Sequence, residues 1–364
     1  MTWKNRTAEE RRKHVGSFVA VTPTMKRASA ILRRCYDAYH EEQQASCSFV
    51  VGETGVGKTT VANDFLEVIN EEYLGTMVDG RNLKLADKSD YDHTMSVTFE
   101  KPGHGFVRPI VKIQVGKKTT YKQLFANTLA ALGIKMPHTA TTDEMKAVAR
   151  QQIKEQEIKM IIFDDCQHIA ESTFRRDPYE AADVFKALIK ETRVQVLCMG
   201  LPHALDFLLA NGQLETVKNE ECTMRPFSLE LGQDSEYVKF LRSLSDDLPF
   251  DINPHLHETS TALRLHLASD GYIGAITKYV GLAAKEAINT KLETITMDVF
   301  EEIYRRKHDV PDNENPFFLK EDPNPDGFKQ VKEERRKTRL RTAAKGQAVR
   351  RAKARAAALM KGVI

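Results

Sequence analysis

The sequence predicts an α/β fold in which a parallel β-sheet is covered by helices and is followed by a small helical lid domain and a basic tail. Three observations predict it. A glycine-rich loop, GETGVGKT at 52–59, stands between a short apolar run and a helical pattern. Further short β-branched runs alternate with helical stretches, which is typical of parallel sheets with helices on both faces. After Pro226 only helical patterns follow.

The elements of the first domain follow in order from composition and periodicity. Residues 1–45 are polar and basic with one helical pattern, so we expect an N-terminal arm. The core domain is expected over 46–232, with a hairpin inserted at about 78–105, where MSVTFE stands inside a polar segment. Strands are predicted at SCSFVVG, RPIVKIQV, KMIIFDD and VQVLCMG, and helices at TTVANDFLEVINEEY, YKQLFANTLAALGI and YEAADVFKALIKET.

The second half of the chain divides by composition. Residues 233–308 contain four helical patterns and predict the lid domain. Residues 309–330 are rich in Pro, Asn and Asp, which predicts a linker. The tail, 331–364, carries twelve Lys and Arg against two acidic residues, in a chain whose formal net charge is only +3. The basic charge is therefore concentrated in the tail.

Composition also bears on the cellular location of the protein. The 364 residues are 41% hydrophobic, enough for a sizeable core, yet no apolar run is long enough to cross a bilayer. The first residues are charged and lack the apolar segment of a signal peptide, so a cytoplasmic location is expected. The five cysteines are scattered, without the spacing of a zinc or redox motif, and are expected to be reduced and mostly buried.

The loop at 52–59 meets the full phosphate-loop pattern in the context of a preceding strand and a following helix. Its glycines let backbone amides turn toward phosphates, and the helix N-terminus adds partial positive charge. Lys58 would reach the outer phosphates and Thr59 would bind magnesium. The predicted ATP-binding residues are Gly52, Gly55, Gly57, Lys58, Thr59, Thr60 and Asp164.

A pair of carboxylates ends the predicted strand MIIFDD about a hundred residues later. Asp164 would hold Mg²⁺ together with Thr59, and Asp165 would polarise the attacking water as the catalytic residue. Such a pair can also be a plain helix cap, but the phosphate loop upstream favours a site.

These residues, together with VQVLCMGLP and ASDGYIGAITKYVGLAAKEAI, resemble the AAA+ ATPases of the TnsC/TniB transposition-regulator family, over roughly residues 20 to 305. Phage Mu B and the secretion ATPase ExeA are similar in outline. The resemblance implies a P-loop AAA+ core that binds ATP between subunits, assembles on duplex DNA as a ring or filament, and recruits or activates a transposase. The implied partners are duplex DNA, transposase subunits, a target-selection protein such as one of a CRISPR-associated complex, and further copies of the chain.

The sequence departs from the family pattern at three places. Asp165 stands where most relatives have Glu, and its shorter side chain predicts slow hydrolysis. The strand VLCMG offers Cys198 and Gly200 where a polar sensor is often found, and the late helix offers only Lys278 for a second sensor. Arg225 lies in the region of an arginine finger, which would make it catalytic in the neighbouring subunit, or it is a surface arginine.

DNA contacts are expected from basic side chains in the insert and just after it, because phosphates are bound by charge. The candidates are Lys101, Arg108, Lys117, Lys118, Thr119 and Lys122. The tail could dock a transposase, bind DNA directly or remain solvated. The alternatives for the whole chain are an ATPase of a secretion or envelope assembly and a nucleotide-gated scaffold without DNA function.

Overall fold

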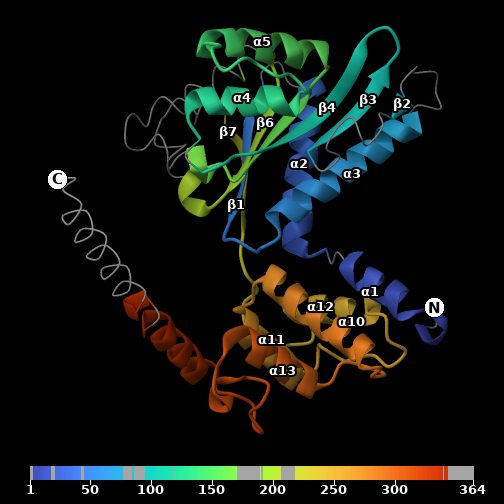
Figure 1. Ribbon diagram of the computed structural model, residues 1–364, viewed down its shortest axis with the longest axis vertical. Coiled ribbons are helices and arrows are strands. Elements are labelled where there is room, and N and C mark those ends of the chain that lie inside the picture. The colour runs from blue at the N-terminus through green and yellow to red at the C-terminus, as the bar shows by residue number, and fades with distance from the viewer. Residues whose placement is uncertain are drawn as a thin grey trace, which may run out of the picture. The chain divides into compact units, whose positions relative to one another are not determined.

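The computed structural model describes most of the chain, in two compact units (Figure 1). One unit is Val21–Pro226, and the other combines Met1–Ala20 with Phe227–Ile364. The described residues are 3–17, 21–41, 45–76, 84–85, 95–117, 119–169, 189, 192–205, 218–338 and 340–342.

The unit Val21–Pro226 is built on a seven-stranded sheet in the order β2-β3-β4-β5-β6-β1-β7. Five neighbouring strands, β4 to β7 through β1, run parallel, which confirms the predicted α/β class. β2 and β3 add an antiparallel edge. The strands are β1 (Cys47–Gly52), β2 (Lys84–Leu85), β3 (Ser96–Lys101), β4 (Gly105–Gln114), β5 (Met160–Asp164), β6 (Gln195–Gly200) and β7 (Lys218–Met224).

The expected hairpin at 78–105 is part of this sheet. β3 pairs with β4, the strand predicted from RPIVKIQV, and β2 pairs with β3. The remainder of the insert, 78–83 and 86–94, lies outside the described residues. The insert therefore extends the main sheet by an edge.

Helices cover both faces of the sheet (Figure 1). α2 (Pro23–Glu41) and α3 (Lys58–Thr76) pack on one face, and α4 (Tyr121–Ala131) and α5 (Thr142–Glu155) lie over the other. α5 begins with a capping box, in which Thr141 accepts from the amide of Glu144 and the Glu144 carboxylate accepts from that of Thr141. The helix expected over YEAADVFKALIKET falls largely outside the described residues.

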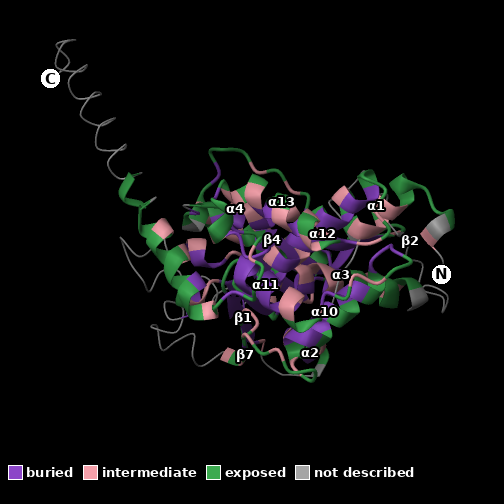
Figure 2. Cartoon of the chain, turned by 90° about the horizontal axis from the view of Figure 1, so that it is seen from below, coloured by how far each residue is buried: buried purple, intermediate pink, exposed green. Residues whose placement is uncertain are grey.

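Strand alternation decides which apolar side chains meet which helices. In β1, Cys47, Phe49 and Val51 point into the cluster that α4 and α5 cover, because side chains two apart share a face of a strand. Every residue of β1, β5 and β6 is buried, as expected for central parallel strands. Figure 2 colours this buried interior purple and the exposed helix faces green.

The second unit is helical, as predicted. It contains η1 (Trp3–Asn5), α1 (Ala8–Ser17), α10 (Glu236–Asp247), α11 (Thr259–Ser269), α12 (Ile273–Asn289), α13 (Met297–His308) and η3 (Asp312–Glu314). α1 packs on α12, so the arm expected at 1–45 is divided: α1 belongs to this unit, whereas α2 belongs to the sheet unit.

The expected linker at 309–330 is packed against the helical unit. Arg264 on α11 is 4% exposed and donates hydrogen bonds to the carbonyls of Leu319 (2.9 Å) and Glu321 (3.1 Å), and also to that of Pro316. Asn315 and Phe317 are buried beside it. The abundance of Pro and Asn therefore reflects an ordered irregular segment whose carbonyls a buried arginine satisfies.

The beginning of the expected tail is also packed. Residues 325–338 form a C-terminal helix in which Phe328 is buried. Lys332 of this helix donates to the Asp270 carboxylate at 2.7 Å and to the Leu267 carbonyl at 3.0 Å. Residues 331–338 are thus part of the helical unit, while residues 343–364 lie outside the described residues.

Two further expectations concern the cysteines and the membrane-spanning character of the helices. All five cysteines are free and buried. None of the helices in the described part of the chain combines the length and the apolar character that a membrane crossing requires.

Candidate nucleotide site

The phosphate loop connects the end of β1 to the start of α3, as the motif requires. Gly55 and Gly57 have φ of 89° and 97°, a region that only glycine enters freely, and this lets the loop curl its amides inward. Gly52 has no room for a side chain, because an added Cβ would lie 2.4 Å from the carbonyl oxygen of Met224 on β7. The loop is therefore fixed between β1 and β7.

Lys58 is held over this loop. Its side chain is buried, with the residue 8% exposed, and Nζ donates to the carbonyls of Gly52 at 2.7 Å and Glu53 at 3.0 Å. Burial lowers the pKa of Lys58, and the carboxylates of Asp164 and Asp165 oppose that shift. The ammonium lies where the outer phosphates of a nucleotide would replace the loop carbonyls as its partners.

Asp164 and Thr59 form the second part of the site. The Thr59 hydroxyl donates to the Asp164 carboxylate at 3.0 Å, which joins the first turn of α3 to the end of β5. Asp164 is 1% exposed, and this burial raises its pKa. A buried carboxylate beside a hydroxyl and the phosphate loop is a donor set that fits Mg²⁺. Thr59 and Asp164 are therefore the residues that would hold it.

Asp165 lies at the same end of the sheet with both carboxylate oxygens engaged. Its φ of 57° takes the chain out of the strand, a left-handed turn that Asp tolerates better than most residues. Gln114 donates to Oδ2 at 2.5 Å and Gln167 donates to Oδ1 at 3.0 Å. The candidate catalytic carboxylate is thus held by two amide side chains.

Gln167 supplies a polar group at the end of β6, where the strand itself offers only Cys198 and Gly200. Its Oε1 accepts from the amide of Leu201 at 3.2 Å, so the side chain bridges Asp165 and the end of β6. A Cβ at Gly200 would lie 2.7 Å from that Oε1 and 2.8 Å from the Cys166 sulfur. Gly200 leaves the space that the Gln167 amide occupies.

Sequence reasoning assigned neither Gln114 nor Gln167 to the site. A signal for Gln114 was present, because it ends the strand RPIVKIQ and parallel strands end at the same edge of a sheet. Which strand lies beside β5 is decided by the strand order, with Gln114 paired to Asp164. That order cannot be read from spacing.

Arg225 directly follows Met224, the residue of β7 that contacts Gly52. Its side chain is exposed and begins beside the phosphate loop of its own chain. Thr60 lies in the first turn of α3, and Lys278 belongs to α12 of the other unit.

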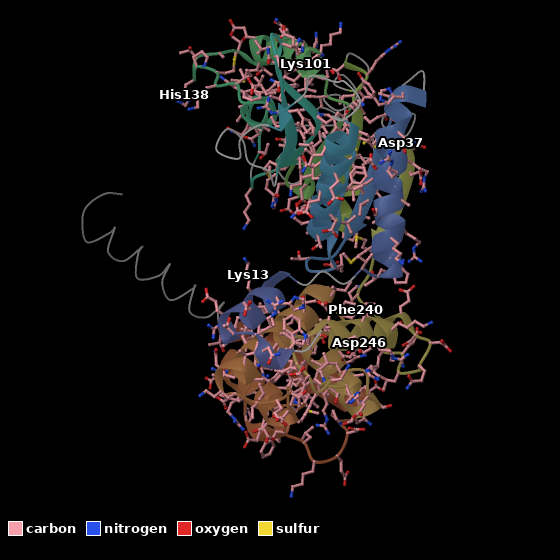
Figure 3. All side chains as sticks on the ribbon, turned by 90° about the vertical axis from the view of Figure 1, so that its right-hand side faces the viewer. Lys13, Asp37, Lys101, His138, Phe240 and Asp246 are labelled. Atoms are coloured by element: carbon pink, nitrogen blue, oxygen red, sulfur yellow. The ribbon has the colours of Figure 1, made fainter. Side chains whose placement is uncertain are left out.

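The six candidate DNA contacts are separated by the structure. Arg108 and Thr119 are 4% and 3% exposed, so neither offers a surface to a DNA backbone, and we remove both from the predicted contacts. Lys101 pairs with Glu157 at 2.5 Å and lies toward the hairpin end of the sheet unit (Figure 3). Lys117 and Lys122 are exposed, and Lys118 lies outside the described residues.

Comparison with known protein families finds a match in the middle of the chain. Residues 89–218 match the family model described as bacterial TniB protein. This range includes both aspartates and both glutamines described above, and the phosphate loop precedes it. No curated protein sequence matches the chain.

Solved structures share the fold at low sequence identity. The Aeropyrum pernix ORC1 protein, solved in complex with DNA, is 13% identical with a TM-score of 0.55, covering 83% of this chain and 69% of that one. CDC6p from Pyrobaculum aerophilum is 12% identical with a TM-score of 0.52, covering 82% and 71%. Drosophila ORC bound to DNA is 11% identical with a TM-score of 0.50, covering 85% and 68%.

These structures are AAA+ P-loop ATPases, and what this chain shares with them is the fold. The chain therefore has the AAA+ fold, and the family match over residues 89–218 together with this fold supports ATPase activity.

Proposed function

We propose that the chain is an ATP-dependent DNA-binding regulator of transposition, which oligomerises on duplex DNA and couples target selection to transposase recruitment. One observation carries the proposal: a complete phosphate loop with its paired aspartates occurs in a chain that matches the TniB family. The AAA+ fold alone would support many other activities.

The residues of the site suit a nucleotide switch. Lys58 and the amides of the loop would bind the phosphates of ATP, while Thr59 and Asp164 would hold Mg²⁺, which neutralises charge on the phosphates. ATP bound between neighbouring subunits would stabilise the assembly by its binding energy, and hydrolysis would release it. Arg225 is a candidate for the residue that senses the nucleotide of a neighbour.

Hydrolysis is proposed to be slow for two reasons. Asp165 is one methylene shorter than Glu, which sets its carboxylate back from the water that it must polarise. Its two oxygens also accept hydrogen bonds from Gln114 and Gln167, so a shift of the carboxylate toward the attacking water has to weaken one of these bonds. The triphosphate state would therefore be long-lived.

The DNA part of the proposal draws on the related structures and on charge. The ORC1 protein of Aeropyrum pernix and Drosophila ORC were both solved with DNA. Lys117 and Lys122 remain exposed candidates for phosphate contacts, and the basic residues 343–364 remain a candidate for DNA binding or for docking a transposase. A target-selection protein is the further partner that the family match suggests.

The proposal is tested by electron microscopy and sedimentation of the full-length protein with duplex DNA. The samples contain ATP, a slowly hydrolysed analogue or ADP. Lys58→Ala is the control, because it lacks the lysine that would bind the outer phosphates. Rings or filaments that require both DNA and a triphosphate are expected. A protein that ignores DNA in every nucleotide state would favour the scaffold alternative.

The tail is tested by deleting residues 343–364, because residues 325–338 are part of the folded unit. The truncated protein is expected to bind ATP with unchanged affinity and to lose DNA affinity or transposase recruitment. An unchanged transposition rate would remove the tail from the mechanism.

A further inference from the structure

Arg108 is a buried cation without a counter-ion among the described residues. It is 4% exposed, and its guanidinium donates to the side-chain oxygen of Gln156 and lies 5.1 Å from the centre of the Phe106 ring. The Nε atom has no hydrogen-bond partner within the described structure. Burial lowers the pKa of Arg108, and no charge among the described residues opposes that shift. The side chain is therefore incompletely satisfied.

A buried arginine in this condition is unusual. Guanidinium groups inside proteins are normally paired with carboxylates or phosphates, because an unpaired charge loses its hydration without compensation. One neutral amide oxygen and the face of a ring replace only part of that hydration. A negatively charged group that bound next to Arg108 would pair with its charge and compensate for the lost hydration.

The structure contains a cavity where such a group would fit. A cavity of about 380 Å³ lies between α4 and the strands β3 and β4, and Arg108 forms part of its lining. Small residues leave the space open, among them Ala130 and Gly133, and a Cβ at Gly133 would lie 3.5 Å from the Arg108 guanidinium. Ser96 and Asn127 add polar groups to the wall.

We propose that this cavity binds a small organic oxyanion, carrying carboxylate or phosphate groups, with Arg108 as its anchor. The planar guanidinium matches either anion, and the hydroxyl and amide of the lining can orient the rest of the molecule. A mixture of apolar wall and a few convergent polar groups is typical of small-molecule sites.

The cavity also touches the nucleotide site through one residue. Gln114 lines it and donates to the carboxylate of Asp165. A ligand that hydrogen-bonds to Gln114 would compete with Asp165 for the amide and so change the hydrolysis rate. This regulatory consequence rests on the proposed ATPase function, whereas binding itself does not.

Binding is tested by calorimetric titration of the full-length Lys58→Ala protein, in which the phosphate loop has lost its cation and competes less strongly for anions. Inorganic phosphate and citrate are the two probes, at constant ionic strength set with chloride, so the two anion classes are separated. Saturable binding of at least one probe is expected. In the same background, Arg108→Met is expected to weaken it at least tenfold, while Lys239→Met, which removes an exposed charge on α10, leaves it within twofold.

A second variant separates a lost anchor from a disturbed fold. Asn127→Leu keeps Arg108 and fills the cavity from α4, and it should also abolish binding while Arg108→Lys retains part of it. Equal affinity with and without Arg108→Met in the Lys58→Ala background, or no binding of either probe, would overturn the proposal. These outcomes do not depend on DNA binding or hydrolysis, so they are distinguishable from a failure of the proposed function.

Discussion

Gln114 at the end of β4 donates a 2.5 Å hydrogen bond to Asp165, which follows the last residue of β5. The two residues are 51 positions apart and meet because β4 and β5 are neighbours in parallel register, with Gln114 beside Asp164. The same carboxylate accepts from Gln167 at 3.0 Å. The position of the candidate catalytic acid is thus set from two sides.

Removing Gln114 is expected to speed hydrolysis. Gln114→Ala frees one oxygen of Asp165, and lifting a restraint of about 1 kcal/mol corresponds to a rise in kcat of about fivefold. The affinity for ATP should stay within twofold, because the side chain of Gln114 donates to Asp165 and not to a residue of the phosphate loop. Steady-state ATPase kinetics and nucleotide titration measure the two quantities.

Gln123→Ala is the matched control, since Gln123 is an exposed glutamine of α4 whose side chain donates to Asn127 and whose backbone amide donates to Thr120. It should leave kcat unchanged. A fall in kcat for Gln114→Ala would mean that the amide orients Asp165 for catalysis and does not restrain it.

Gly200→Ala is expected to disturb the other amide. The new Cβ would overlap Oε1 of Gln167 and the sulfur of Cys166, so one of them must move. We expect a loss of about 2 kcal/mol in the free energy of unfolding and an altered kcat, measured by denaturant titration and ATPase assay. Gly116→Ala is a control with a looser site, because its Cβ would lie 3.8 Å from Thr119. Equal stability of both variants would contradict the crowding described at Gly200.

Asp164→Asn should stabilise the nucleotide-free protein and abolish its further stabilisation by Mg²⁺ and ATP. The buried carboxylate has a raised pKa because burial disfavours its charge, so a neutral amide of similar shape should raise the Tm of the nucleotide-free protein. The added stabilisation by Mg²⁺ and ATP, visible as a further rise in Tm in the wild type, should disappear. A lower Tm without nucleotide would show that the hydrogen bonds from Thr59 and the Asp165 amide outweigh the desolvation.

Arg264→Met is expected to destabilise the helical unit by about 3 kcal/mol, because several carbonyls of 316–321 would lose a buried charged donor. Asp322→Asn removes only the exposed ionic partner of the same arginine, and a cost under about 1 kcal/mol is expected. Denaturant unfolding of both variants measures the difference. Similar values would mean that the ion pair, and not the carbonyl contacts, holds the segment.

The stability of the helical unit should fall as the pH is lowered from 7 to 5. His266 is buried and shares a 2.9 Å hydrogen bond between Nε2 and the Phe227 carbonyl, while burial lowers its pKa below the ordinary value of 6.5. The unfolded chain therefore takes up a proton at a higher pH than the folded one, and stability is lost as pH falls through that window. The charged groups that act on His266 include Lys329, Lys332 and Asp270.

His266→Gln keeps a donor for the carbonyl and removes the titration, so the fall in Tm between pH 7 and pH 5 should be smaller than in the wild type. The comparison uses thermal unfolding of both proteins in matched buffers. An identical decrease in both would assign the pH dependence to other groups.

The sequence alone determined the parts of this protein that depend on contiguous residues. The phosphate loop needs one strand, one glycine-rich turn and one helix in succession, so GETGVGKT in its context was enough to predict it. The alternation of strands and helices predicted the α/β class, and helical periodicity after Pro226 predicted the helices of the second unit that follow this residue. Each of these patterns is local, and local periodicity survives without knowledge of the neighbours.

Tertiary structure decided what depends on which distant segments meet. The strand order brought Gln114 to Asp165, and packing against α4 and α5 buried Arg108, which its charge alone had suggested was a DNA contact. The buried Arg264 donates to the carbonyls of an expected linker, which is therefore part of the folded unit. Burial and pairing are properties of the packed molecule, because the free energy of a charge depends on what surrounds it in space and not on its neighbours along the chain.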